Sequence, residues 1–261
     1  MKIACQEGLA PGATLREKVA NMEKFGFEGL ETWGRGLAGR VDEIKKALEG
    51  TTIKLGSICA GFGGCPLDAD KSQRDMAIND CKEILKAAGD LGAVGMIFVP
   101  IFGSPRIPDL SPLADPIKLE KDLMVLLGQE MGETAAAAGT MLLLEPLNRY
   151  ETHLIKRLED GVEIAERIGN PHVKIMADFF HMSIEERDIP ASIRAAGSWI
   201  QHVHLADSTR LLPGYGHTDF KSGFAALKDV GFDKYMALEC GIPGDPMVEL
   251  PKCVQYLKGC M

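Results

Sequence analysis

The chain has 261 residues, 46% of them hydrophobic and 25% charged, which is ordinary for a globular protein and long enough for two average domains or one barrel. The formal net charge is -8 and no segment is rich in lysine and arginine, so the sequence argues against a nucleic-acid partner. The 7 cysteines are scattered without a CxxC pair, the N-terminus reads as a strand rather than a signal peptide, and no apolar run approaches membrane-spanning length. We therefore expect a cytoplasmic protein with reduced thiols and no membrane segment.

Strand and helix patterns alternate from one end of the chain to the other. In chain order, the expected strand and helix of each unit are 2–5 and 15–25, 29–33 and 41–48, 53–58 and 70–91, 95–100 and 116–138, 141–144 and 154–168, 173–177 and 190–196, 200–205 and 220–230, and 236–238 and 248–257. Such alternation calls for a parallel sheet, and eight units close it into a (β/α)8 TIM barrel of the α/β class. No linker divides the sequence, so we expect a single domain over residues 1–261.

The competing fold for an alternating sequence is the doubly wound open sheet. That fold usually has a phosphate-binding glycine fingerprint after its first strand. Residues 6–12 read Gln-Glu-Gly-Leu-Ala-Pro-Gly, which is not such a fingerprint. The barrel is therefore the preferred prediction.

Four neighbouring strands of the predicted barrel each lead to a polar residue that could bind a metal. These residues are Glu145, Asp178, His204 and Glu239. A carboxylate at the end of an apolar strand cannot be buried without a partner. Because the carboxyl ends of barrel strands meet at one mouth, we expect the four side chains to converge there.

Three carboxylates and one imidazole form a hard, oxygen-rich ligand set. Such a set suits Mn²⁺, Mg²⁺ or Co²⁺ better than a thiolate-type zinc site, although Zn²⁺ is not excluded. Three negative ligands exceed the charge of a divalent ion by one, so one glutamate could act as a base while the metal neutralises an enediolate. Taken singly, the residues have plainer explanations: Glu145 could pair with Arg149, and His202 could be held in the core by a neighbouring hydroxyl or carboxylate.

Several segments after residue 141 resemble those of the xylose isomerase-like barrel superfamily. They read Glu-Pro-Leu-Asn-Arg-Tyr-Glu-Thr at 145–152, Asp-Phe-Phe-His-Met at 178–182, and His-Val-His-Leu-Ala-Asp at 202–207, followed by Arg210, Pro-Gly-Tyr-Gly-His at 213–217 and Asp-Phe at 219–220. Within the superfamily, the chain is most similar to the sugar isomerase/epimerase branch, which includes ketose 3-epimerases and hydroxypyruvate isomerases. The similarity spans essentially the whole chain, but before Gly95 it rests mainly on the order of the elements.

The resemblance implies a divalent-metal-dependent isomerase that acts on a ketose or related keto-sugar through a cis-enediolate, with 3-epimerisation as the expected outcome. The implied ligands of the metal, Mn²⁺ by first choice, are Glu145, Asp178, His204 and Glu239. Glu145 and Glu239 would also form an acid/base pair on opposite faces of the sugar. His181 and Arg210 would donate hydrogen bonds to the oxygen that gains negative charge, and Glu151 would hold the first hydroxyl groups of the sugar. A homo-oligomer, either a dimer or a tetramer, is expected by the same resemblance.

Two features concern how the substrate is held. After Glu239 the chain reads Cys-Gly-Ile-Pro-Gly, where ketose epimerases place a bulky aromatic residue against the sugar, so the far end of the substrate is expected to bind differently. Trp33, at the end of the second strand, could stack on sugar C–H bonds, or it could simply pack at the barrel rim.

Other outcomes stay open for the same site. The enediolate could lead to aldose–ketose or hydroxypyruvate-type isomerisation, or to elimination by a lyase acting on a 3-keto-glycoside. The endonuclease arm of the superfamily uses a trinuclear zinc cluster with histidines from earlier strands, whereas this acidic chain has 6 histidines and none before His153. A phosphodiesterase of the AP-endonuclease type is therefore less favoured. A non-catalytic sugar-binding role is less favoured because the ligand set, with both glutamates, is intact.

Overall fold

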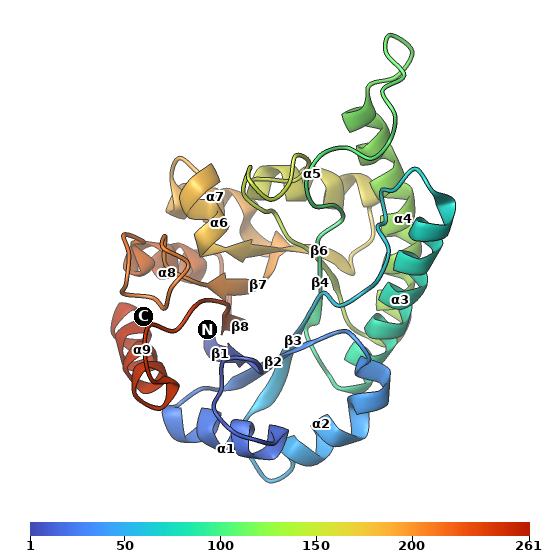
Figure 1. The fold of residues 1–261 in the computed structure, drawn as a ribbon. Helices are drawn as coiled ribbons and strands as arrows, with labels where there is room; N and C mark the ends of the chain where they lie inside the picture. Colours follow the sequence, from blue (N-terminus) through green and yellow to red (C-terminus); the bar gives the residue numbers. More distant parts are fainter.

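The computed structural model describes all 261 residues, and its centre is a closed barrel of parallel strands (Figure 1). Neighbouring strands pair in sequence order, and the last strand closes the barrel by pairing with the first. The strands are β1 Lys2–Gln6, β2 Gly29–Trp33, β3 Lys54–Cys59, β4 Gly95–Phe98, β5 Leu142–Leu144, β6 Val173–Asp178, β7 Ile200–Leu205 and β8 Tyr235–Leu238. The predicted (β/α)8 barrel is confirmed.

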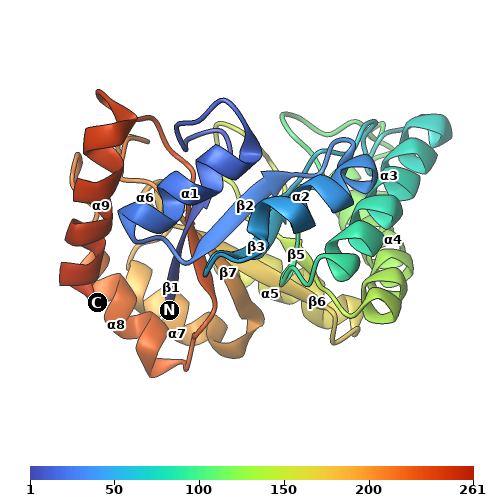
Figure 2. The same cartoon turned by 90° about the horizontal axis from the view of Figure 1, so that it is seen from below.

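Helices surround the barrel on its outer face, as the turned view in Figure 2 shows. They are α1 Leu15–Phe25, η1 Leu37–Arg40, α2 Val41–Leu48, α3 Lys71–Asp90, α4 Pro116–Ala138, α5 Leu158–Ile168, α6 Phe179–Glu185, α7 Ile189–Ala196, η2 Gly197–Trp199, α8 Phe220–Asp229 and α9 Pro246–Cys260. None of these helices combines the length and the apolar character needed to cross a membrane.

Capping side chains explain where many of the helices begin. The aspartates that precede α3, α4, α7, α8 and α9 each accept a hydrogen bond from a backbone N–H of the first turn. At the start of α1, Thr14 and Glu17 form a capping box. These caps satisfy backbone N–H groups that the helix itself leaves without partners, so they fix the point at which each loop ends.

A short helix that the sequence analysis did not predict follows β6 directly. Asp178 ends β6 and is also the N-cap of α6, because its Oδ1 accepts hydrogen bonds from the N–H groups of Phe180 at 2.7 Å and His181 at 3.4 Å. Seven residues are too few for apolar periodicity to stand out in a sequence. The helix holds His181 within one turn of Asp178, at the mouth of the barrel.

Two other helices differ from their predicted ranges by more than one residue at an end. The fifth helix begins at Leu158 rather than at residue 154, because the Asp160 carboxylate accepts hydrogen bonds from the N–H groups of Lys156 and Arg157, both at 3.0 Å, and so caps the helix there. The last helix extends beyond its predicted range at both ends and contains Pro251. Neither difference moves a residue of the predicted site.

Strand residues alternate between the barrel interior and the layer beneath the helices. In β5, Leu142 and Leu144 belong to the main core of 60 buried residues, whereas Leu143 packs in a separate small cluster that includes Cys59 and Met176. Since the outer core also contains the apolar residues of the helices, this separate cluster lies inside the barrel. The same alternation turns polar side chains of β2 and β7 inwards, where they form the floor of the site described next.

Candidate metal centre and active site

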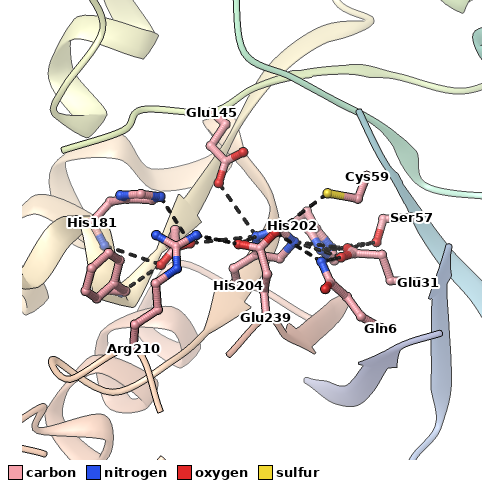
Figure 3. Close-up of polar contacts among 12 residues, drawn as sticks. Gln6, Glu31, Ser57, Cys59, Glu145, His181, His202, His204, Arg210 and Glu239 are labelled. Atoms are coloured by element: carbon pink, nitrogen blue, oxygen red, sulfur yellow. Dashed lines mark hydrogen bonds and ion pairs between the residues drawn. The ribbon is translucent and has the colours of Figure 1, made fainter. Parts of the chain in front are cut away.

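The four residues predicted to converge at the barrel mouth lie together in the structure, and Figure 3 labels three of them, Glu145, His204 and Glu239. Each offers one ligand atom, and these atoms all lie within 4.8 Å of one another. Glu145 follows β5, Asp178 ends β6, His204 lies in β7 and Glu239 follows β8. Four consecutive strands thus supply one side chain each, because parallel strands of a barrel end at the same face.

The ring of His204 lies at the centre of this cluster. Its Nδ1 is 3.3 Å from Oε2 of Glu239, 3.6 Å from Oε1 of Glu145 and 3.7 Å from Oδ2 of Asp178. This nitrogen is buried and has no hydrogen-bond partner. A buried polar atom without a partner is costly, and the three oxygens around it complete a ligand set suited to a hard divalent cation. The residues present therefore fit the ion that the sequence analysis expects.

The ionisable groups of the cluster titrate differently because their surroundings differ. Burial raises the pKa of Glu145 to about 7, and the charges of Glu239 and Asp178 act in the same direction. Burial also opposes ionisation of Glu239, but the charge of His204 outweighs it and lowers the pKa of that carboxyl. Burial favours the neutral ring of His204, yet the surrounding carboxylates, Glu31 and Glu239 foremost, raise its pKa well above the ordinary value. This shift favours the protonated ring, and a bound cation would take the place of the proton on Nδ1 and leave the ring neutral.

A second set of polar residues lies beside His204, on the side away from His181 (Figure 3). Glu31, in β2, has no exposed surface and accepts hydrogen bonds from His202 Nε2 at 2.8 Å and from His204 Nε2 at 3.0 Å. Ser57 Oγ at 2.6 Å and Gln6 Nε2 at 2.8 Å also donate to this carboxylate. Burial opposes its ionisation, but the two histidines outweigh burial and hold the pKa of Glu31 well below its usual range.

The contacts of His202 agree with the prediction that a neighbouring hydroxyl or carboxylate holds it in the core, since its Nε2 contacts Glu31 and Ser57. The sequence analysis did not single out Glu31 itself. Its signal in the sequence is its place between Leu30 and Thr32 in a short strand with buried residues on either side. A carboxylate at such an inward position needs donors, and those donors come from other strands.

His181 is held in one orientation by a residue that the sequence analysis also missed. Its Nδ1 lies 3.2 Å from the backbone nitrogen of Asn148 and 2.8 Å from Nδ2 of the same residue. A backbone N–H can only donate, so this Nδ1 is the acceptor and the hydrogen of the neutral ring is on Nε2. The pKa of His181 is lowered, mainly by burial, which keeps the ring neutral. The Nε2 of His181 lies 3.6 Å from Asp178 Oδ2, so this donor faces the cluster of candidate metal ligands.

Arg210 brings a positive charge to the edge of the cluster. Its Nη1 donates to Glu151 Oε1 at 3.1 Å, its Nη2 donates to Glu239 Oε2 at 3.4 Å, and its guanidinium lies 4.5 Å from the ring centre of Phe180. The backbone of Arg210 has a φ of 57°, in the left-handed region. A hydrogen bond from the N–H of Gly241 to its carbonyl, at 2.8 Å, helps to hold that conformation.

The loop that carries Arg210 is organised by Asp207. Oδ1 of this buried aspartate accepts hydrogen bonds from the N–H groups of Ser208 at 2.8 Å and Thr218 at 3.0 Å, and its Oδ2 accepts one from Gly214 at 2.8 Å. Burial opposes ionisation, but these three hydrogen bonds outweigh it and lower the pKa of Asp207. The carboxylate thus ties together both ends and the middle of the loop.

Of the remaining predicted residues, Glu151 lies in this network and Trp33 does not. Glu151 Oε1 accepts from Asn148 Nδ2 at 2.9 Å as well as from Arg210. Trp33 ends β2 with 49% of its surface exposed, and no hydrogen bond or ion pair joins it to the four clustered ligands. It pairs in register with Cys59, whose Sγ lies 3.7 Å from Glu239 Oε1, so its backbone is at the mouth of the barrel.

Comparison with known proteins places this barrel among related folds. A family model described as a xylose isomerase-like TIM barrel matches residues 19–258. A 3-dehydro-D-guloside 4-epimerase of Escherichia coli (strain K12) is 29% identical over 265 aligned positions, covering the whole of both chains. A D-psicose 3-epimerase of Ruminiclostridium cellulolyticum is 37% identical over 111 residues, which are 42% of this chain and 38% of that protein.

Solved structures agree with the sequence comparisons. The apo crystal structure of a 3-keto-D-glucoside 4-epimerase from E. coli superposes with a TM-score of 0.91 at 28% identity, covering all of both chains. The D-psicose 3-epimerase of Clostridium cellulolyticum H10, crystallised with D-tagatose, superposes with a TM-score of 0.87 at 23% identity, covering 100% of this chain and 99% of that one. The likeness to the D-psicose 3-epimerase shows the fold alone. The likeness to the E. coli 4-epimerase accompanies a sequence similarity that covers the whole of both chains.

Proposed function

The chain belongs to the xylose isomerase-like TIM barrel family, and we propose that it is a divalent-metal-dependent epimerase that acts on a keto-sugar. The observation that carries the proposal is the buried Nδ1 of His204, which has no hydrogen-bond partner and is surrounded by the carboxylates of Glu145, Asp178 and Glu239. The named relatives are carbohydrate epimerases, which supports an epimerase with this ligand set.

The metal ion in this proposal is held by the four clustered residues, with Mn²⁺ as first choice and Mg²⁺, Co²⁺ and Zn²⁺ as alternatives. Oxygen ligands predominate in the set, which favours a hard ion over one that prefers thiolates. When bound, the ion supplies positive charge next to the carbonyl and hydroxyl oxygens of the sugar.

Two carboxylates of the chain can transfer the protons. We assign removal of the proton next to the carbonyl to one of Glu145 and Glu239, and return of a proton on the opposite face to the other. Both carboxylates belong to the cluster whose ligand atoms lie within 4.8 Å of one another, so both can reach a sugar bound there. Which of the two starts depends on the configuration of the substrate.

Other residues bind and orient the sugar in this proposal. The Nε2–H of His181 and the guanidinium of Arg210 donate hydrogen bonds to the oxygen on which negative charge develops. Glu151 accepts hydrogen bonds from sugar hydroxyl groups, and Trp33 offers a stacking face at the rim. Because Asn148 and Asp207 fix the donors beforehand, little reorganisation is needed during the reaction.

Two keto-sugar classes fit a proton transfer next to a carbonyl. A free ketose would be inverted at C3, as in the D-psicose 3-epimerases, and a 3-keto-glycoside would be inverted at C4. The end-to-end alignment with the E. coli 4-epimerase favours the 3-keto-glycoside, whereas the local alignment with the D-psicose enzyme covers less than half of this chain. Elimination by a lyase is not favoured, because the named relatives epimerise their substrates.

The test is proton exchange in D₂O. The Mn²⁺-loaded protein is incubated with free ketoses and with 3-keto-glycosides, the metal is removed with a chelator, and proton NMR then shows which C–H has exchanged. Metal-dependent exchange at C3 of a ketose or at C4 of a 3-keto-glycoside would identify the substrate class. Absence of exchange with every sugar, in protein shown to bind Mn²⁺, would contradict the proposal.

Matched variants make the assignment of the glutamates specific. Glu145→Gln and Glu239→Gln are each expected to lower the exchange rate by at least about 10²-fold, because each removes a general acid or base. Glu120→Gln is the control: Glu120 is also fully buried, but it pairs with His153 away from the cluster. An equal loss of exchange in all three variants would indicate misfolding rather than lost chemistry.

The compartment, the assembly and the domain limits remain proposals. We place the protein in the cytoplasm, which is supported by the absence of disulfides among its seven cysteines. One barrel domain over residues 1–261 is proposed because no linker divides the sequence, and a homo-oligomeric assembly is proposed from the family resemblance.

A further inference from the structure

One fully buried carboxylate near the proposed active site takes no part in the proposed proton transfers. Glu31 lies in β2, has no exposed surface and points toward His202 and His204 (Figure 3). An ionised carboxylate is strongly disfavoured in such a place unless donors surround it. Its contacts therefore indicate what it does.

Four side chains donate hydrogen bonds to Glu31. Oε1 accepts from Gln6 Nε2 at 2.8 Å and from His204 Nε2 at 3.0 Å. Oε2 accepts from Ser57 Oγ at 2.6 Å and from His202 Nε2 at 2.8 Å. An ionised carboxylate can only accept, so each histidine must carry a hydrogen on Nε2.

The tautomer of His204 decides what its other nitrogen can do. A neutral imidazole carries one hydrogen, so a hydrogen on Nε2 leaves a lone pair on Nδ1. That Nδ1 has no hydrogen-bond partner and faces the carboxylates of Glu145, Asp178 and Glu239. With the opposite tautomer, Nδ1 would carry the hydrogen and could not bind a cation.

We propose that Glu31 is a positioning residue, which holds His204 in the tautomer with its hydrogen on Nε2 and so presents Nδ1 to a divalent cation. The inference rests on the proposed function only in assuming that a cation binds here, and it is independent of which sugar reacts. Gln6 links Glu31 to Glu239, a second candidate metal ligand, because its Nε2 lies 2.8 Å from Glu31 Oε1 and 3.1 Å from Glu239 Oε1.

The test is metal affinity measured by calorimetric titration of the chelator-treated protein with Mn²⁺. Glu31→Gln is expected to raise the Kd for Mn²⁺ by about 10–100-fold, the effect typical of removing a carboxylate that orients a metal-bound histidine. Glu120→Gln is the matched control, because Glu120 is equally buried and also pairs with a histidine, His153, at 2.5 Å. The control is expected to keep the Kd of the wild type.

A spectroscopic measurement separates positioning from general loosening of the barrel. In the Zn²⁺-loaded protein labelled with ¹⁵N-histidine, hydrogen bonds to Glu31 should protect the Nε2–H protons of His202 and His204 from exchange with water. In Glu31→Gln both signals should broaden or shift, while that of His153 should stay unchanged. If Glu31 had only a structural role, the Nε2–H of His204 would stay as protected from exchange as it is in the wild type.

The outcomes separate the two proposals. A weakened Kd in Glu31→Gln with a wild-type Kd in Glu120→Gln supports the positioning role, even if the wild type exchanges no sugar proton. An unchanged Kd in Glu31→Gln overturns it, even if the wild type is an active epimerase. If Glu31→Gln does not fold, the test uses Glu31→Asp. This variant keeps the negative charge but moves the carboxylate away from His204 by one methylene group. An unchanged Kd for Mn²⁺ in Glu31→Asp overturns the positioning role equally. A wild type that binds no divalent ion overturns both proposals.

Discussion

The hydrogen bonds to Asp207 lead to a prediction that does not depend on the substrate. The variant is Asp207→Asn, which keeps the size and shape of the side chain but replaces one acceptor oxygen by an NH₂ group. The wild-type carboxylate accepts from three backbone N–H groups, those of Ser208, Gly214 and Thr218. An asparagine has only one acceptor atom, so at least one of these N–H groups must face a donor.

The expected cost follows from these contacts. One buried N–H left without an acceptor costs about 1–3 kcal/mol, and the hydrogen bonds that remain lose their charge assistance, which makes them roughly half as strong. We therefore expect the free energy of unfolding to fall by about 2–4 kcal/mol, which lowers the Tm of a chain of this size by roughly 4–8 °C.

The loss of stability in Asp207→Asn should also depend on pH, and it should become smaller as the pH falls. The pKa of Asp207 is lowered in the folded protein, where hydrogen bonds from Thr218, Ser208 and Gly214 outweigh the effect of burial. Its contribution to stability is therefore complete above the unfolded-state pKa of about 4 and disappears as the pH falls through the lower folded-state value. The difference between wild type and variant should be constant near neutral pH and should shrink below about pH 4.

The assay is urea unfolding of the chelator-treated proteins from about pH 3.5, just below the ordinary aspartate pKa, to about pH 7. Asp219→Asn is the control, because Asp219 is the N-cap of α8 and accepts from one backbone N–H, that of Ser222, and from its hydroxyl. Asparagine caps a helix about as well as aspartate, so this control should stay within roughly 0.5 kcal/mol of the wild type. A loss in Asp207→Asn no larger than that of the control, or one that persists unchanged at acid pH, would refute the reasoning.

Two further predictions concern the site and its rim. In Asn148→Ala, the Nδ1 of His181 loses one of its two donors, so we expect kcat/KM for proton exchange to fall about 5–30-fold, equivalent to about 1–2 kcal/mol, with the Kd for Mn²⁺ unchanged. An unchanged kcat/KM would show that the backbone N–H alone fixes the ring. In Gly61→Ala, the new Cβ would lie 2.2 Å from the backbone nitrogen of Arg35 at a φ of 100°, so urea unfolding should show a loss of about 2–5 kcal/mol. Gly36→Ala, at a φ of 70° with no atom within 4 Å, should cost only about 1 kcal/mol, and equal losses in the two variants would contradict the packing argument.

Much of the barrel could be predicted because the signals are local. Apolar runs and helical spacing gave eight alternating units, and the predicted ranges 15–25, 29–33, 41–48, 116–138 and 200–205 coincide with α1, β2, α2, α4 and β7. The prediction failed for α6, whose seven residues begin at a side-chain cap rather than in a periodic run. The start of α5, which depends on the capping carboxylate of Asp160, was misplaced for the same reason.

The predicted metal ligands also followed from local sequence. A polar residue at the end of an apolar strand is visible without a structure, and closure of the barrel brings such ends together. The structure gathers the ligand atoms of Glu145, Asp178, His204 and Glu239 within 4.8 Å of one another.

The sequence by itself determined the order of strands and helices and the side chains that reach the mouth of the barrel, because both depend on the spacing of neighbouring residues. Only the tertiary structure decided which partners those side chains meet. Glu31 contacts His202, 171 positions further along the chain, and it does so because the strands wrap around a common axis in a particular register. Strand register and ring orientation are set by packing across the whole barrel, so no local pattern encodes the hydrogen bonds that fix His204 through Glu31 and His181 through Asn148.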